Sequence, residues 1–260
     1  MNNVKKVLFI VEGEYTEREV LKRIETVFNL DFTICCFNAN IYALYKRLAE
    51  LGFNADIKQV LTELHPSYSE DLADKFVYTY LVFDFDAHHP KKEDHRTLEE
   101  ITYANIRRLQ KMAMYFTDET DPTIGKLYIN YPMVESFRTC DMPFDPGYQN
   151  EYVTIDSMKD FKNYAGTKKM AHKRIDTYSR YDFKELTRMN IYKLAHIMLD
   201  DWGDITYNQY LDYSGTMEIL NQQTDIIKQT NQIAVLNTML FMLTDYYGNQ
   251  KNKFFDFIMK

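Results

Sequence analysis

The chain has 260 residues, of which 45% are hydrophobic and 27% charged, and this composition excludes an intrinsically disordered protein. Its formal net charge of −7 argues against a protein whose whole surface binds nucleic acid, because phosphate neutralisation needs clustered Lys and Arg. An enzyme that meets a polyanion through one local patch stays open, since acids gathered around a metal lower the net charge without repelling the substrate everywhere.

Predicted strands and helices alternate through the first half of the chain. In chain order, the sequence predicts a strand at 6–11, a helix from residue 16, a strand at 32–37, helices at 41–51 and 57–64, a strand at 76–86, a helix from residue 97 and a strand at 126–131. Thr16 with Glu19, and Thr97 with Glu100, fit capping boxes at the starts of two helices. This alternation predicts an α/β fold with a parallel sheet, helices on its faces and right-handed crossovers.

The second half of the chain carries no strong strand signal after residue 132. Helices are predicted at 182–201, 207–228 and 230–247, the last ended by Gly248. We expect an α/β catalytic domain at residues 1–140 and a mainly helical portion at residues 141–260 that binds substrate or forms a dimer. The alternative is one domain whose C-terminal helices pack directly on the sheet. A homodimer contact is expected within residues 205–247.

Three acidic residues follow two of the predicted strands. Glu12 comes directly after the first strand, and Asp84 and Asp86 end the third. Ligands of open α/β sheets collect at the carboxyl ends of strands, and residues two apart on a strand face the same side. We therefore expect these carboxylates to converge within about 8 Å, a span that one or two metal ions can cover, with Phe85 turned into the core.

The chemistry of this acidic group predicts a metal ion. Oxygen ligands without Cys or His select Mg²⁺, or Mn²⁺ as a substitute. Gly13 has no Cβ, so it leaves room beside the backbone for a phosphate or a metal-bound water, and it precedes a helix N-terminus that favours anions. The other interpretation is ordinary turn chemistry at strand ends, although two neighbouring buried carboxylates are costly without a cation.

The densest basic stretch lies at residues 159–188, where tyrosines are interleaved with Lys and Arg. Basic and aromatic groups together are typical of a surface that tracks a nucleic-acid backbone and stacks bases. Acidic residues within the same stretch allow the alternative of a solvated helix face with mixed charges. The residues expected to contact nucleic acid are Lys168, Lys169, Lys173 and Arg174.

Two short motifs resemble those of Toprim proteins. The segment FIVEGEYTE resembles the first Toprim motif, an acidic residue and a glycine after a hydrophobic strand, and LVFDFD resembles the second, an Asp-x-Asp at the end of a later strand. The pattern Glu-Gly-x-x-Thr-Glu, followed by Asn-x-Pro-x-x-Glu within INYPMVESF, is similar to the RloB-like branch, which is related to the OLD-type nucleases of phage defence. The resemblance covers residues 4–138, and it departs from the branch in the tyrosine of NYP and in the Ser-Phe that follows Glu135.

The resemblance implies a Toprim fold in which Glu12, Asp84 and Asp86 are the catalytic, metal-binding acids. It adds Glu17 as a further metal ligand and Glu135 as a further catalytic acid, which holds a second metal or positions water. Each of these two is predicted in the first turn of a helix, where a carboxylate is also favourable without any function.

The function expected on these grounds is a Mg²⁺-dependent endonuclease that hydrolyses phosphodiesters of RNA or DNA. The resemblance places it in phage defence, with an activator derived from phage or from a toxin system. The alternative is a non-catalytic Toprim-like module that binds a nucleotide or a partner protein, in which the carboxylates are splayed or tied up by Lys and Arg. A third reading is a metal-dependent phosphotransferase with a closed small-molecule pocket.

The expected compartment is the cytoplasm. No apolar run approaches the length of a membrane span, and the N-terminal stretch lacks the long apolar core and cleavage site of a signal peptide. The three cysteines form neither a disulfide framework nor a metal-ligand spacing, as in a reduced protein.

Overall fold

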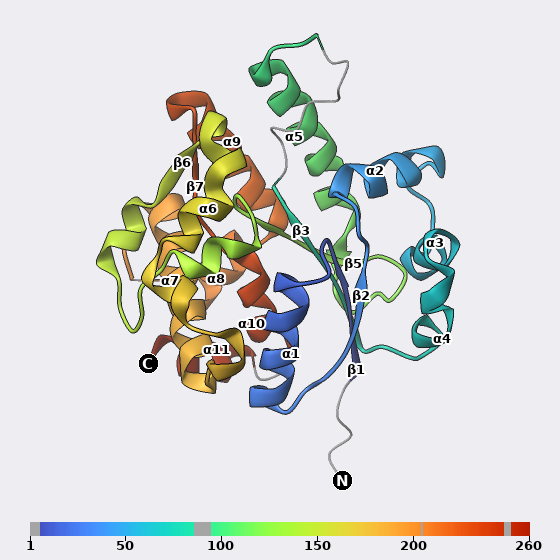
Figure 1. Cartoon of the computed structure of the whole chain (residues 1–260), viewed down its shortest axis with the longest axis horizontal. Coiled ribbons are helices and arrows are strands. Elements are labelled where there is room, and N and C mark those ends of the chain that lie inside the picture. The colour runs from blue at the N-terminus through green and yellow to red at the C-terminus, as the bar shows by residue number, and fades with distance from the viewer. Residues whose placement is uncertain (1–5, 86–94, 204, 247–250) are drawn as a thin grey trace.

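A mostly parallel sheet of five strands forms the centre of the computed structural model, which describes residues 6–85, 95–203, 205–246 and 251–260 (Figure 1). The strand order is β2-β1-β3-β5-β4. Only the short edge strand β4 runs antiparallel to its neighbour. The strands are β1 (Lys6–Val11), β2 (Asp31–Cys36), β3 (Tyr78–Asp84), β4 (Thr117–Asp118) and β5 (Gly125–Asn130).

β1 is an interior strand of the sheet and pairs in parallel with β2 and β3, which confirms the predicted parallel sheet. Strands β1 and β3 are almost wholly apolar because helices cover the sheet on both faces, as parallel sheets require. Phe85, directly after β3, is fully buried, as expected.

Helices from the first half of the chain lie on both faces of the sheet. Figure 1 shows α1 on one face and α2 with α5 on the other, which is the arrangement that right-handed crossovers give for this strand order. The helices are α1 (Thr16–Phe28), α2 (Ile41–Glu50), α3 (Ile57–Leu64), α4 (Ser69–Leu72) and α5 (Leu98–Tyr115). Each of the longer ones, α1, α2, α3 and α5, buries the apolar stripe that its sequence predicts.

The C-terminal part is mainly helical and packs directly against the sheet. Its helices are α6 (Phe161–Gly166), α7 (Arg180–Leu199), α8 (Tyr207–Tyr213), α9 (Thr216–Thr230), α10 (Met242–Tyr246) and α11 (Lys251–Met259), and an antiparallel pair is formed by β6 (Tyr152–Thr154) and β7 (Gln232–Ala234). Thr238 donates a hydrogen bond to the carbonyl of Ile129 in β5, and Tyr131 exchanges backbone hydrogen bonds with Leu236. The hydrophobic core therefore continues from the sheet into these helices without a break.

Two of the predicted C-terminal helices are wrong. The span 207–228 is divided at Ser214 and Gly215 into α8 and α9, since Gly215 is the N-cap of the second helix. The span 230–247 is not one helix: it holds β7, a 3-10 turn and α10, because its backbone pairs with distant segments of the chain. Gly248 lies outside the described residues.

Of the two predicted capping boxes, one is confirmed and one is wrong. Thr97 and Glu100 form the reciprocal hydrogen bonds of a capping box at the start of α5. At α1 the N-cap is Tyr15, without a side-chain cap, and Thr16 is already the first helical residue. The Thr16 hydroxyl instead donates to Glu135, so tertiary contact replaces the local cap.

Several tyrosines of the expected dimer segment lie inside the chain's own core. Tyr210 and Tyr246 are buried, and the Tyr210 hydroxyl bonds that of Thr244. Among the described residues, no helix has the length and apolar character needed to cross a membrane.

Candidate acidic site at the carboxyl ends of the strands

Glu12 and Asp84 lie side by side where β1 and β3 end. The backbone N–H of Glu12 donates to the carbonyl of Val82, and the backbone N–H of Asp84 donates to Oε2 of Glu12 at 3.2 Å. Oδ1 of Asp84 in turn accepts from the backbone N–H of Val134 at 2.8 Å. These bonds tie the ends of two parallel strands to the segment after β5, as expected for a site at the carboxyl edge of the sheet.

Glu17 projects from the first turn of α1 back over the loop that follows β1. Its carboxylate is only 5% exposed and accepts from the backbone N–H of Gly13 at 3.2 Å. A Cβ on Gly13 would lie 3.2 Å from Oε2 of Glu17, so glycine permits the close approach of this carboxylate. The Glu17 carboxylate therefore lies beside Gly13, on the side where the sequence predicted room for a phosphate.

Glu135 comes from the 3-10 helix η2 (Val134–Arg138), directly beyond β5. It is 3% exposed, and its Oε1 accepts from the Thr16 hydroxyl at 3.2 Å. The same oxygen forms an ion pair with Lys162 of α6 at 3.1 Å, although the Lys162 side chain is 72% exposed. Lys162 thus reaches the buried carboxylate from the surface.

Four of the predicted acids line one pocket of about 220 Å³: Glu12, Glu17, Asp84 and Glu135. The sequence placed each of them beyond a strand or in a first helical turn, and the parallel sheet brings them to one edge. Gly13, Thr16 and Lys162 line the same pocket. Asp86, the third acid of the predicted metal set, lies outside the described residues, so the expected 8 Å convergence of all three stays a prediction.

Within the part of the chain that the structure describes, no three acidic, His or Cys side chains are grouped as a ready metal cage. Two carboxylates of the pocket are engaged by the backbone. Oxygen atoms of Glu12 and Asp84 face backbone N–H groups. A cation that used these carboxylates would share them with the backbone donors that orient them.

Burial, more than the neighbouring carboxylates, raises the pKa of Glu17. Burial raises the pKa of Glu17, and the negative charge of Glu135 raises it further, against the hydrogen bond from Gly13 and the positive charge of Lys162. A raised carboxyl pKa means that the folded state holds a proton more tightly than the unfolded chain. The ionised form of Glu17 therefore destabilises the metal-free fold.

We expect Glu17→Gln to increase the free energy of unfolding of the metal-free protein at pH 7. Gln keeps Oε1 as acceptor for Gly13 and removes the buried charge. Because the folded pKa lies above the ordinary value of 4.5, wild-type stability should fall as pH rises from about 4.5 through the folded pKa, and the variant should lose this decline. Urea unfolding in EDTA at a series of pH values measures the free energy of unfolding of both proteins. If the variant shows the same decline with pH as wild type, Glu17 is not the group responsible.

Three of the four residues expected to contact nucleic acid pair with acids. Lys168 pairs with Glu151 at 2.7 Å and lies over the ring of Tyr164, Lys173 pairs with Asp182 at 2.6 Å, and Arg174 pairs with Asp176 at 2.5 Å. Lys169 is exposed in a short 3-10 helix. Lys173 and Arg174 line a second pocket, together with Arg23 and Arg138, whereas Lys168 and Lys169 do not line it.

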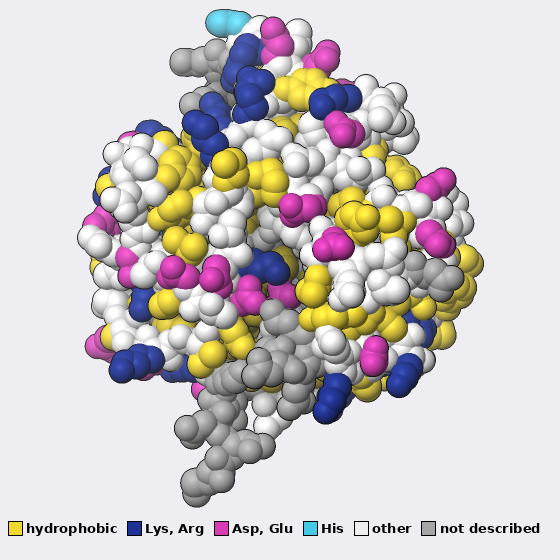
Figure 2. Space-filling model, turned by 180° about the vertical axis from the view of Figure 1, so that it is seen from behind, with side chains coloured by type: hydrophobic (Ala, Val, Ile, Leu, Met, Phe, Trp, Pro, Cys, Tyr) yellow, Lys and Arg dark blue, Asp and Glu magenta, His cyan; other side chains and the backbone are white. Residues whose placement is uncertain are grey.

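Arg23 and Arg138 could not be predicted as site residues from the sequence. Arg23 is one of several charged residues on the polar side of a predicted helix, and Arg138 follows a segment with no regular periodicity. A further basic group lies elsewhere: Figure 2 shows Lys and Arg side chains gathered at the end of the molecule where α5 lies, and Arg96 and Arg107 line a hollow there with Glu99 and Glu100.

No protein-family model, curated protein or solved structure matches the chain at a significant level.

Proposed function

We propose that this chain is a divalent-metal-dependent endonuclease that hydrolyses phosphodiesters of RNA or DNA in the cytoplasm. The observation that carries the proposal is the placement of Glu12 and Asp84 at the carboxyl ends of adjacent parallel strands, in one pocket with Glu17 and Glu135. Four carboxylates from three separate parts of the chain converge there, and such groups are costly to bury together without a cation.

The chemistry of the donor set fits Mg²⁺ or Mn²⁺. Every acidic group of the pocket offers carboxylate oxygen, and neither Cys nor His is among the described residues that line it. The sequence supplies one more carboxylate, Asp86, two positions after Asp84. A bound divalent ion would polarise the scissile phosphate and lower the pKa of the attacking water.

The chain's own residues would orient and balance charge around that reaction. The backbone N–H groups of Asp84 and Val134 fix the two strand-end carboxylates, and the Gly13 N–H fixes Glu17. Lys162 sits at the exposed side of the pocket, where its ammonium can bind a phosphate oxygen once it turns from Glu135. A positive charge at that place stabilises the negative charge that develops on a phosphate during hydrolysis.

One observation favours the second candidate, a non-catalytic module that binds a nucleotide or a partner protein. Glu135 is held by Lys162 and by the Thr16 hydroxyl, which is the tied-up state expected of a carboxylate without a metal role. If this candidate is correct, Glu135 is structural and the pocket recognises a ligand through Lys162 and the loop that contains Gly13.

Incubation of the purified protein with a mixed panel of RNA and DNA, with Mg²⁺, Mn²⁺ or EDTA, tests the proposal. The expected result is cleavage with either metal and none with EDTA. A second arm adds lysate from phage-infected cells, because the family resemblance implies an activator derived from phage or from a toxin system. Calorimetric titration with Mn²⁺ accompanies both arms. Absence of Mn²⁺ binding together with absence of cleavage in both arms rejects the nuclease and supports the binding module.

A further inference from the structure

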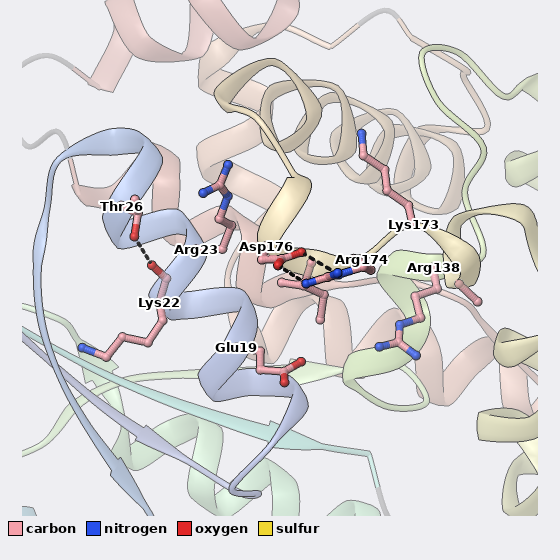
Figure 3. Close-up of a pocket in the computed structure, with 10 residues that line it drawn as sticks. Glu19, Lys22, Arg23, Thr26, Arg138, Lys173, Arg174 and Asp176 are labelled. Carbon is pink, nitrogen blue, oxygen red and sulfur yellow. Dashed lines mark hydrogen bonds and ion pairs between the residues drawn. The ribbon is translucent and has the colours of Figure 1, made fainter.

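A second, larger pocket lies between α1 and the segment that follows α6, with a volume of about 570 Å³ (Figure 3). Helix α1 contributes Lys22 and Arg23 to its lining, η2 contributes Arg138, and the later segment contributes Lys173 and Arg174. Figure 3 shows these side chains arriving from three separate parts of the chain. Five cationic side chains thus surround one hollow in a protein whose net charge is −7.

The charges of this pocket are not fully balanced. Two acids, Glu19 and Asp176, also line it. Arg174 pairs with Asp176, while Lys22 and Lys173 pair with acids outside the lining, Glu25 and Asp182. Among the residues that the structure describes, no carboxylate forms an ion pair with the remaining two cations of the lining, Arg23 and Arg138.

One hydrogen bond holds the Arg23 side chain in place. Its Nε donates to the backbone carbonyl of Tyr178 at 2.6 Å, and Tyr178 is itself buried. This bond fixes the plane of the guanidinium and leaves its two terminal nitrogens as donors. Arg138 lies with its guanidinium 5.4 Å from the ring of Phe137. Planar guanidinium groups of this kind bind phosphate oxygens through paired hydrogen bonds.

Helix α1 and the 3-10 helix η2 each contribute residues to both pockets. Helix α1 carries Glu17 in the acidic pocket and Arg23 in the basic one, six residues later, which is ~9 Å along a helix at 1.5 Å per residue. Likewise η2 carries Glu135 in the first pocket and Arg138 in the second. Successive phosphates of a nucleic-acid strand are ~3.4 Å apart along the helix axis. If one phosphate lies in the acidic pocket, the phosphate two or three nucleotides further along would reach the basic pocket.

We propose that Arg23 and Arg138 form a phosphate-binding subsite for the backbone of the substrate strand, a few nucleotides from the bond that is cleaved. The identity of the ligand as a nucleic-acid strand rests on the proposed function. The subsite itself rests on the unbalanced charge of the pocket and on the orientation of Arg23. Lys173 and Arg174 extend the positive field at its rim.

Fluorescence anisotropy tests the subsite by measuring the binding of labelled single-stranded RNA and DNA oligonucleotides. The measurements are made in EDTA, which prevents cleavage, and over a range of salt concentrations. Arg138→Gln is the deciding variant, because Arg138 lies over the ring of the adjacent Phe137 and forms no ion pair with any described residue. Arg23→Gln is its companion, and circular dichroism checks that the Tyr178 segment stays in place. Lys46→Gln, which removes the same charge from an exposed position on α2, is the matched control.

Each arginine variant should weaken binding about five- to eightfold at 0.1 M salt and reduce the slope of log affinity against log salt by about 0.7–0.9, as loss of one phosphate contact implies. Lys46→Gln should match wild type. Cleavage by wild type with equal affinity and slope in Arg138→Gln and Lys46→Gln overturns the subsite and leaves the nuclease standing. Arginine-dependent binding without cleavage under any metal, with or without lysate, overturns the nuclease and leaves the subsite; absence of both binding and cleavage by wild type overturns both.

Discussion

Asp84→Asn is expected to abolish Mg²⁺-dependent cleavage while the fold stays intact. Asn has nearly the same volume as Asp and keeps Oδ1 as acceptor for the Val134 N–H, so the hydrogen bond that joins β3 to the segment after β5 can persist. The substitution removes one negative charge from the proposed ligand set. Loss of a partner in the outer shell of a metal costs roughly 10–100-fold in affinity or activity, and loss of a direct ligand should cost more.

The control for this experiment is Asp225→Asn, which makes the same chemical change on the exposed face of α9, where Asp225 pairs only with Lys228. The cleavage rate and the melting temperature of both variants are compared with wild type in Mg²⁺ and in EDTA. Asp225→Asn should cleave as wild type does. Full cleavage by a correctly folded Asp84→Asn protein would show that the assigned site is wrong.

The acidic pocket follows from local sequence features, which is why most of its residues could be predicted. A continuous apolar strand ends at Val11 and another at Asp84, and parallel pairing of the two brings the residues beyond them to one edge of the sheet. Glu17 and Glu135 were predicted from the motif resemblance, and each was expected in the first turn of a helix. Their hydrogen-bond partners could not be predicted, because Thr16 and Lys162 meet Glu135 from more than twenty residues away in the chain.

The C-terminal part shows where sequence patterns stop being sufficient. The span 230–247 holds short apolar runs interrupted by polar residues, and runs of that length fit either a helix or a strand. Its three-residue strand β7 exists because β6, some eighty residues earlier, pairs with it. Arg23 and Arg138 are brought together by the docking of α1 against the segment after β5, a tertiary contact with no counterpart in either local sequence.

Lys193 is a buried ionisable residue whose titration should change the stability of the fold. It lies on α7, fully buried, and its Nζ donates to the backbone carbonyls of Gln149 and Glu151. The ammonium also lies 4.0 Å from the centre of the Tyr152 ring. Burial lowers the pKa of Lys193 to about 7, against the opposing effect of the negative charge of Glu151.

The stability of the protein should therefore rise with pH above neutrality. Between pH 7 and the ordinary lysine value of 10.5, the unfolded chain binds a proton at this residue that the folded chain has released. The free energy of unfolding should increase in this window by at most about 1.4 kcal/mol per pH unit, and the contribution should be flat below it.

Lys193→Met, which keeps the length of the side chain and removes its titration, should flatten this rise. Urea unfolding of wild type and variant between pH 6 and pH 9 measures the two slopes, and Lys46→Met on the exposed surface of α2 should keep the wild-type slope. Equal slopes in all three proteins would mean that Lys193 stays protonated in the fold, held by the carbonyls of Gln149 and Glu151 and by the face of Tyr152. A flattened slope in Lys193→Met alone would mean that Lys193 is a neutral amine in the fold above pH 7. In that state its hydrogen bonds to the carbonyls of Gln149 and Glu151 hold α7 to the segment that precedes α6.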